Sequence, residues 1–126
     1  MKVVAILNPE NGSCRQTLSL LKNLSEEGKE IKEIVLVLEN TYKAEKWVLS
    51  LSMPLSKTEV EKIKETYRKK VISVWSALTG EENIPPLRVE VCDAPKAVKE
   101  MELTDVDLLV LGCLENNSLC KLIETL

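Results

Sequence analysis

Two cysteines stand at positions where a thiol could do chemistry. Cys113 directly follows Gly112 at the end of an apolar run, and Cys14 lies in the first turn of a predicted helix. A helix N-terminus stabilises a thiolate, which makes either residue a candidate redox-responsive thiol. Free cysteine is usually buried and inert, so the alternative is that both are small apolar residues of the core.

Two loops are candidate binding sites. The segment 112–118, from Gly112 to Ser118, follows a predicted strand, and ligands of open parallel sheets sit beyond the carboxyl ends of strands. The segment 11–13, Asn-Gly-Ser, precedes a predicted helix whose first backbone N–H groups could hold an anion. The alternative for this second loop is an ordinary capping box, made by Ser13 and Gln16.

The residues that the chain lacks exclude several reactions. It contains no histidine, which excludes Ser-His-Asp triads and His-ligated metal sites. Its four cysteines have no paired spacing, and its four glycines form neither a phosphate-binding loop nor a dinucleotide-binding loop. Residues 7–10 supply one carboxylate too few for the Mg²⁺ pocket of a receiver domain. We therefore expect no catalytic residues and no metal site.

Composition limits the class of protein. The 126 residues predict a single domain, 1–126, and a net charge of −3 does not favour nucleic acid as a partner. No apolar stretch approaches the roughly 20 residues of a membrane span, and no signal peptide opens the chain, so we expect a cytoplasmic protein without a membrane partner. Reduced thiols explain the cysteines better than a disulfide framework. Abundant Lys and Glu resemble the composition of heat-adapted proteins.

Hydrophobic periodicity predicts alternating strands and helices. We expect strands over 2–7, 31–38, 87–92 and 107–111, and helices over 14–27, 57–79, 94–101 and 118–126. Residues 40–55 predict a short helix or a flap over the sheet edge. Strands that alternate with helices form right-handed βαβ units, so the strands should be parallel.

The long helix is the only predicted basic surface. Residues 57–79 carry six basic and three acidic side chains, a net charge of +3, whereas the rest of the chain sums to −6. Arg68, Lys69 and Lys70 are either a solvated outer face or a contact for an acidic partner.

Two motifs make the chain similar to the universal stress protein family over essentially its whole length. Residues 93–98, Asp-Ala-Pro-Lys-Ala-Val, stand where the family has G-D-P-A-x-x-I, and residues 105–112, Asp-Val-Asp-Leu-Leu-Val-Leu-Gly, stand where it has A-D-L-I-V-M-G. The resemblance implies an α/β fold of the Rossmann-like, adenine nucleotide alpha hydrolase-like type. Its sheet would be doubly wound, mostly parallel and open, in the order 3-2-1-4, with helices on both faces and the family's fifth strand absent.

The nucleotide-binding subset of this family has a fuller glycine pattern, from which this chain departs. That pattern resembles G-x-x-G, nine residues, then G-S or G-T. Here Gly112 fills the first place, Glu115 replaces the second glycine, and Thr125-Leu126 replace the last pair. Backbone N–H groups converge on phosphate oxygens in conformations with positive φ, which residues other than glycine resist. A glutamate at this place also adds negative charge beside a triphosphate. Asn8 also replaces the acid that often ends the first strand, so we expect no ATP cofactor.

The resulting prediction is a non-catalytic binding or scaffold module of the stress response. The first alternative is an adenine-nucleotide-binding protein, with at most slow hydrolysis, that uses Asn8, Leu38 and Gly112 around base and ribose. The second is a redox-responsive module that uses Cys113 or Cys14. Without a fifth strand, the edge of strand 107–111 should be covered, and we expect a two-fold homodimer.

Overall fold

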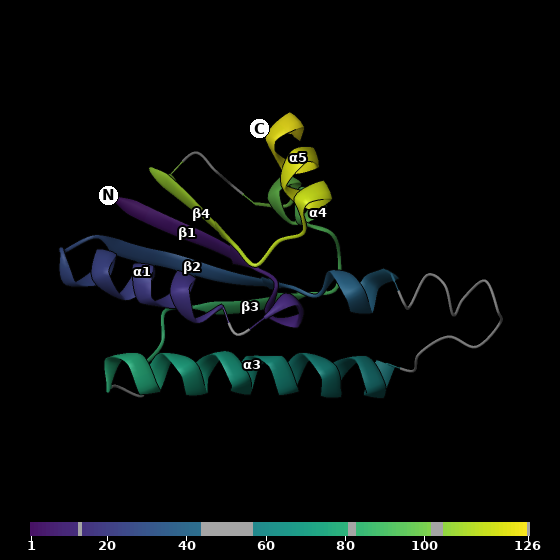
Figure 1. Ribbon diagram of the computed structural model, residues 1–126, viewed down its shortest axis with the longest axis horizontal. Helices are drawn as coiled ribbons and strands as arrows, with labels where there is room; N and C mark the ends of the chain where they lie inside the picture. The colour runs from purple at the N-terminus through teal and green to yellow at the C-terminus, as the bar shows by residue number, and fades with distance from the viewer. Residues whose placement is uncertain (13, 44–56, 81–82, 102–104, 126) are drawn as a thin grey trace, which may run out of the picture.

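The computed structural model describes residues 1–12, 14–43, 57–80, 83–101 and 105–125. Its strands form one sheet with the order β3-β2-β1-β4 (Figure 1), and every pair is parallel. The strands are β1 (Lys2–Leu7), β2 (Glu30–Val37), β3 (Leu87–Glu90) and β4 (Leu108–Gly112). The helices are η1 (Pro9–Asn11), α1 (Arg15–Glu26), α3 (Lys57–Thr79), α4 (Ala94–Lys99) and α5 (Asn116–Thr125). The predicted doubly wound α/β class is confirmed.

Helices cover both faces of the sheet. α1 and α3 lie on one face and α4 and α5 on the other, as Figure 1 shows below and above the strands. The first core packs Leu18, Val71 and Trp75 against β1 and β2, and the second packs Ala97, Val98 and Leu122 against the opposite side of the same strands. Strands apolar on both faces are what such a two-sided arrangement requires.

The centre of the sheet is built from the two ends of the chain. β1 pairs with β4 in parallel register from Val3 opposite Leu108 to Leu7 opposite Gly112, and Val3 to Leu7 are all at most 1% exposed. The predicted order 3-2-1-4 of parallel strands places these two segments side by side, and that placement is confirmed.

β4 is less buried than its sequence predicts. The apolar run from Leu108 to Leu111 indicates a strand covered on both faces, yet Leu108 is 36% exposed, and Leu109 and Leu111 are half-buried. The reason is topological: among the described residues, β4 pairs with β1 alone and forms an edge of the sheet. Leu111 and Leu109 still pack against the α4 and α5 core.

Helix ends confirm some predicted caps and correct others. The Asp93 side chain accepts from Lys96 N at 3.0 Å, so Asp93 caps α4, as an Asp before a helix with Pro in its first turn predicts. α1 instead begins after Cys14, which occupies the N-cap in the left-handed region without a side-chain cap. The predicted capping box of Ser13 and Gln16 is therefore wrong in its cap position, and Ser13 itself lies outside the described residues.

Other differences concern the segments beside the sheet. Residues 39–43 are helical, which fits the short helix expected after β2, but most of the predicted flap lies outside the described residues. In α5, Leu122 is fully buried, whereas Ile123, whose apolar spacing in the sequence predicts an inward position, is 67% exposed. Of the helices that the structure describes, none is both long enough and apolar enough to cross a membrane.

Candidate functional site

The loops at the carboxyl ends of the strands form the candidate site. In the order β3-β2-β1-β4, the chain passes from β1 to β2 and β3 on one side of β1 and then crosses to β4 on the other side. The gap between β1 and β4 is therefore the topological switch point. The three residues predicted around a nucleotide lie at this edge. Asn8 follows β1 and donates its backbone N–H to Gly112 O at 3.1 Å, and Leu38 follows β2 and donates to Glu90 O at 2.9 Å.

Asn8 and Glu39 make a buried polar pair below these loops. Both residues are 0% exposed, and Asn8 Nδ2 lies 3.4 Å from Glu39 Oε2. The other carboxylate oxygen, Glu39 Oε1, accepts from Ala94 N at 3.2 Å. Buried polar groups need such partners, because an unsatisfied one is costly. The amide of Asn8 is thus engaged within the protein.

Leu38 offers no surface to a ligand in this structure. Its side chain is 0% exposed and belongs to the core that α1 and α3 cover. The structure therefore places Leu38 at the predicted edge but turns it into the core.

Glu10 is a structural residue of the site that sequence reasoning missed. Its carboxylate accepts from Asn40 N at 2.9 Å, from Thr41 N at 3.1 Å and from Thr41 Oγ1 at 2.7 Å. These donors belong to the first turn of the helical residues 39–43, so Glu10 caps that turn from another loop. The sequence places Glu10 about thirty positions away, and no local pattern marks such a cap.

Two further contacts tie the β4–α5 loop to its neighbours. Asn11 Nδ2 donates to Cys113 O at 2.9 Å, and Lys43 Nζ lies 3.0 Å from Glu115 Oε2. The hydrogen bond and the charge of Glu115 raise the pKa of Lys43 above its ordinary value. The Glu115 carboxylate, at the position of the second family glycine, thus binds a cation of the protein itself.

The hollow beside these contacts is small and polar. It has a volume of about 240 Å³ and is lined by Glu39, Lys43, Asp93, Ser118 and Lys121, among others. Pockets that bury drug-sized ligands usually measure about 300–1,000 Å³. The hollow can accept a small polar group, but it is too small to enclose a nucleoside triphosphate.

The structure joins Cys14 and Cys113 as a disulfide, with 5.9 Å between their Cα atoms. The expectation that all cysteines are reduced thiols is therefore wrong for this pair, while Cys92 and Cys120 are free. The two candidate redox residues lie together at the switch point, although 99 positions separate them in the sequence. Parallel β1 and β4 are what bring them together.

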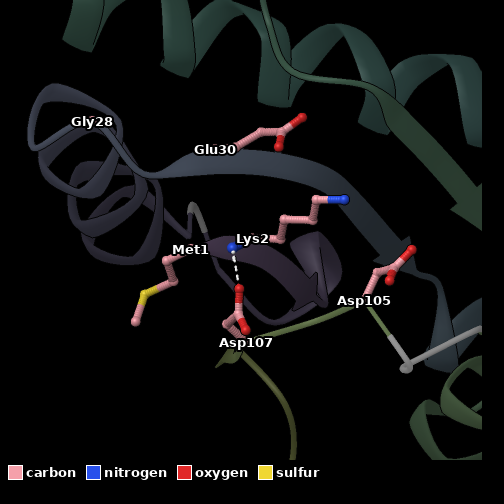
Figure 2. Close-up of a pocket in the computed structure, with 6 residues that line it drawn as sticks. All are labelled: Met1, Lys2, Gly28, Glu30, Asp105 and Asp107. Atoms are coloured by element: carbon pink, nitrogen blue, oxygen red, sulfur yellow. Dashed lines mark hydrogen bonds between the residues drawn. The ribbon is translucent and has the colours of Figure 1, made fainter.

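A second hollow lies at the opposite, amino ends of the strands. Figure 2 shows its lining residues, and its volume is about 480 Å³. Lys2 N donates to Asp107 Oδ2 at 2.7 Å, a contact that fastens the starts of β1 and β4. Asp105 and Glu30 add acidity, but within the described ranges no group of three or more Cys, Asp or Glu side chains is arranged to hold a metal ion. We interpret this hollow as a surface depression between strand ends.

The fold defines the class of protein: a doubly wound, parallel α/β protein whose loops at the β1 and β4 ends form the candidate site. No family model matches the chain. The chain is similar over its whole length to a "Universal stress protein" of Aquifex aeolicus (strain VF5), with 29% identity across 100% of this chain and 94% of that protein. The resemblance to the universal stress protein family seen in the motifs is thereby confirmed over the whole chain.

Proposed function

We propose that this chain is a non-catalytic binding or scaffold module of the stress response, located in the cytoplasm, that works without ATP. The supporting observation is the ion pair between Lys43, in the helical residues 39–43, and Glu115, in the β4–α5 loop. A triphosphate at this loop would meet the Glu115 carboxylate, and it would have to compete for the nearby Lys43 ammonium. Phosphate cradles instead offer converging N–H groups and no carboxylate.

Two other contacts support the same proposal. Asn8 already donates its side-chain amide to Glu39, and the Leu38 side chain is fully buried. A base and ribose at the β1 and β2 ends would therefore find neither a free polar group on Asn8 nor an exposed apolar surface on Leu38. The small hollow at this edge is better matched to a short polar group of a partner.

Thermal unfolding with millimolar ATP and Mg²⁺ tests this proposal. A ligand that binds only the folded state stabilises it by about 2.7 kcal/mol at one hundred times its dissociation constant. We expect no rise in Tm and no ATP hydrolysis above background. A rise of several degrees would instead favour the alternative, an adenine-nucleotide-binding protein that uses Asn8, Leu38 and Gly112.

A matched pair of variants locates the cause. Glu115→Gly supplies the second glycine and removes the charge, whereas Glu115→Gln removes the charge alone. ATP-dependent stabilisation in the glycine variant only would assign the loss of binding to backbone conformation. Stabilisation in both variants would assign it to the carboxylate.

The proposal includes a two-fold homodimer that covers the β4 edge. β4 presents an unpaired edge among the described residues, with Leu108 36% exposed, and Ile123 on α5 is 67% exposed. Proteins usually protect such edges. Light scattering at micromolar concentration should give twice the chain mass, and Leu108→Lys should shift the protein toward monomer. A monomer for the unaltered chain would exclude the homodimer.

A further inference from the structure

Cys14 and Cys113 occupy the two loops that meet at the switch point. Cys14 stands between η1 and α1, and Cys113 directly follows β4. Their Cα atoms are 5.9 Å apart, inside the range of about 4.4–6.8 Å at which two cysteines bridge without backbone movement. The backbone alone therefore presents the two sulfur atoms to each other.

The backbone conformation of both cysteines is unusual. Cys14 has φ 54° and Cys113 has φ 59°, and they are the only non-glycine residues with positive φ in the described part of the chain. The left-handed region is unfavourable for a residue with a Cβ, and such conformations concentrate at functional sites. Here the two residues with positive φ are the two members of one cysteine pair.

The surroundings also accommodate the pair as two thiols. Cys14 Sγ lies 3.4 Å from Asn8 O, which accepts the S–H hydrogen in the reduced form. The Asn11 hydrogen bond to Cys113 O joins the same two loops without the sulfurs. The disulfide is therefore not the sole contact between these loops.

A small reagent can reach the pair. An open hollow of about 470 Å³ is lined by Cys14, Cys113, Arg15, Gln16 and Thr17. Cys113 is half-buried and Cys14 is 4% exposed, so Cys113 is the sulfur more open to attack. The free Cys92 differs: it is buried on the other face of the sheet, and burial raises the pKa of its thiol to about 11.

We propose that Cys14 and Cys113 are a reversible dithiol–disulfide site that exchanges with a small-molecule disulfide such as oxidised glutathione. The Cys113 thiolate attacks one glutathione sulfur and releases the other glutathione as a thiol. Cys14 then attacks Cys113 Sγ, which forms the protein disulfide and releases the second glutathione thiol. Two electrons and two protons pass from the cysteines to the glutathione disulfide.

The consequence of oxidation is a covalent clamp between the start of α1 and the β4–α5 loop. This clamp lies at the edge that the proposed binding function uses, but the exchange does not depend on what binds there. The tests of the proposed binding function and of the homodimer can fail while the thiol–disulfide exchange occurs. The exchange can likewise fail while those tests succeed.

The test equilibrates the folded protein in buffers with varied ratios of oxidised to reduced glutathione, and then blocks free thiols with an alkylating reagent. Digestion with trypsin and Glu-C places Cys14 on the fragment 11–15 and Cys113 on the fragment 103–115, apart from Cys120. Mass spectrometry should show the linked pair growing as the buffer becomes more oxidising and disappearing in excess reduced glutathione. The oxidised protein should melt higher by about 10 °C, because the bond closes a long loop of the unfolded chain.

Variants separate this pair from the remaining thiols. Cys113→Ser and Cys14→Ser should abolish both the linked fragment and the redox-dependent shift in Tm, whereas Cys120→Ser, the matched control at an exposed free cysteine, should keep both. Three results on the unaltered protein would overturn the proposal: both cysteines alkylated at every ratio, a bond that persists in excess reduced glutathione, or linkage through Cys120 instead. Because these three results are measured on the unaltered protein, they decide the proposal whether or not the variants fold.

Discussion

The side-chain amide of Asn8 is bound to the carboxylate of Glu39, with 3.4 Å between Nδ2 and Oε2 and neither residue exposed to solvent. The same Asn8 side chain accepts from Glu10 N at 2.9 Å through Oδ1. Asn8 therefore joins the end of β1 to the turn that follows it and to the end of β2. An acid at this position would face the Glu39 carboxylate.

Asn8→Asp should be strongly destabilising at neutral pH. It places two carboxylates in one buried site, where one of them must have a raised pKa because like charges disfavour ionisation. The deficit should amount to about 2–4 kcal/mol in the free energy of unfolding. With a carboxyl pKa raised in the folded state, the protein keeps its full stability below the unfolded-state pKa, near 4. That stability is lost as pH rises through the folded-state pKa.

Denaturant unfolding between pH 3 and pH 8 measures this effect. Asn8→Ala is the control without a new charge: it removes both side-chain hydrogen bonds and should cost about 1–3 kcal/mol, with a weaker dependence on pH than Asn8→Asp. A deficit of Asn8→Asp that does not shrink on acidification would contradict the proposed repulsion from Glu39.

Gly112→Ala should destabilise the protein because α1 passes close to the end of β4. A Cβ built on Gly112 would lie 2.8 Å from Thr17 Cγ2 and 2.9 Å from Thr17 Cβ. Overpacking of this kind costs about 1–3 kcal/mol. The double variant Gly112→Ala with Thr17→Ala should recover part of the loss, since Cγ2 is removed and Cβ remains. Equal Tm values for the single and double variants would exclude a clash with Thr17 Oγ1 or Cγ2, the two atoms that Thr17→Ala removes.

Cys92 should make stability fall at alkaline pH. Burial, followed by the charges of Glu90, Glu100 and Asp93, raises the pKa of its thiol from 9.0 to about 11, against a smaller opposing effect of Lys96. Because the pKa of the thiol is raised in the folded state, the stabilisation from the neutral Cys92 thiol is complete below pH 9. It is lost as pH rises through about 11. At about 1.4 kcal/mol per pKa unit, the loss approaches about 3 kcal/mol.

Unfolding experiments between pH 8 and pH 11 in a reducing buffer check this loss. Cys92→Ala should be less stable at pH 8 but should lack the component due to thiol ionisation, whereas Cys120→Ser should follow the unaltered chain. Iodoacetamide should also label the exposed Cys120 well before Cys92 at pH 8. Comparable labelling rates in the folded protein would contradict the burial of Cys92.

The Lys43–Glu115 pair should contribute little to stability and should depend on salt. Lys43 is 60% exposed and Glu115 is 37% exposed, and such surface pairs contribute at most about 1 kcal/mol. A double-mutant cycle with Lys43→Met and Glu115→Gln should give a small coupling that decreases between 0.05 and 1 M NaCl, as expected from about a threefold to fivefold shorter screening length. A coupling unaffected by salt would argue against an ionic contact.

Hydrophobic patterning predicts most of this fold because burial on two faces is recorded in local sequence. The run from Val3 to Leu7 is apolar throughout, and the structure gives β1 the predicted bounds, Lys2–Leu7. Asp93 and Pro95 mark the start of α4 for equally local reasons, a side-chain cap and a fixed φ angle. Strand bounds and helix caps that depend on a few neighbouring residues were thus predictable.

Features that depend on distant segments were not predictable from local sequence. The Cys14–Cys113 pair and the cap of residues 39–43 by Glu10 exist only because parallel strands deliver separate loops to one edge. The exposure of Leu108 follows from the position of β4 in the sheet rather than from its composition. For the same reason, the sequence located the edge that carries the site but not the contacts made there.

The pairing of β1 with β4 also bears on how the chain is made. β1 leaves the ribosome about a hundred residues before the strand that completes one of its sides, since Val3 pairs with Leu108. At about 5–20 residues per second, β1 waits several seconds during synthesis before this neighbour emerges. Contacts between such distant segments slow folding, so an apolar strand with one open side is exposed to chaperones or to misassociation throughout that interval.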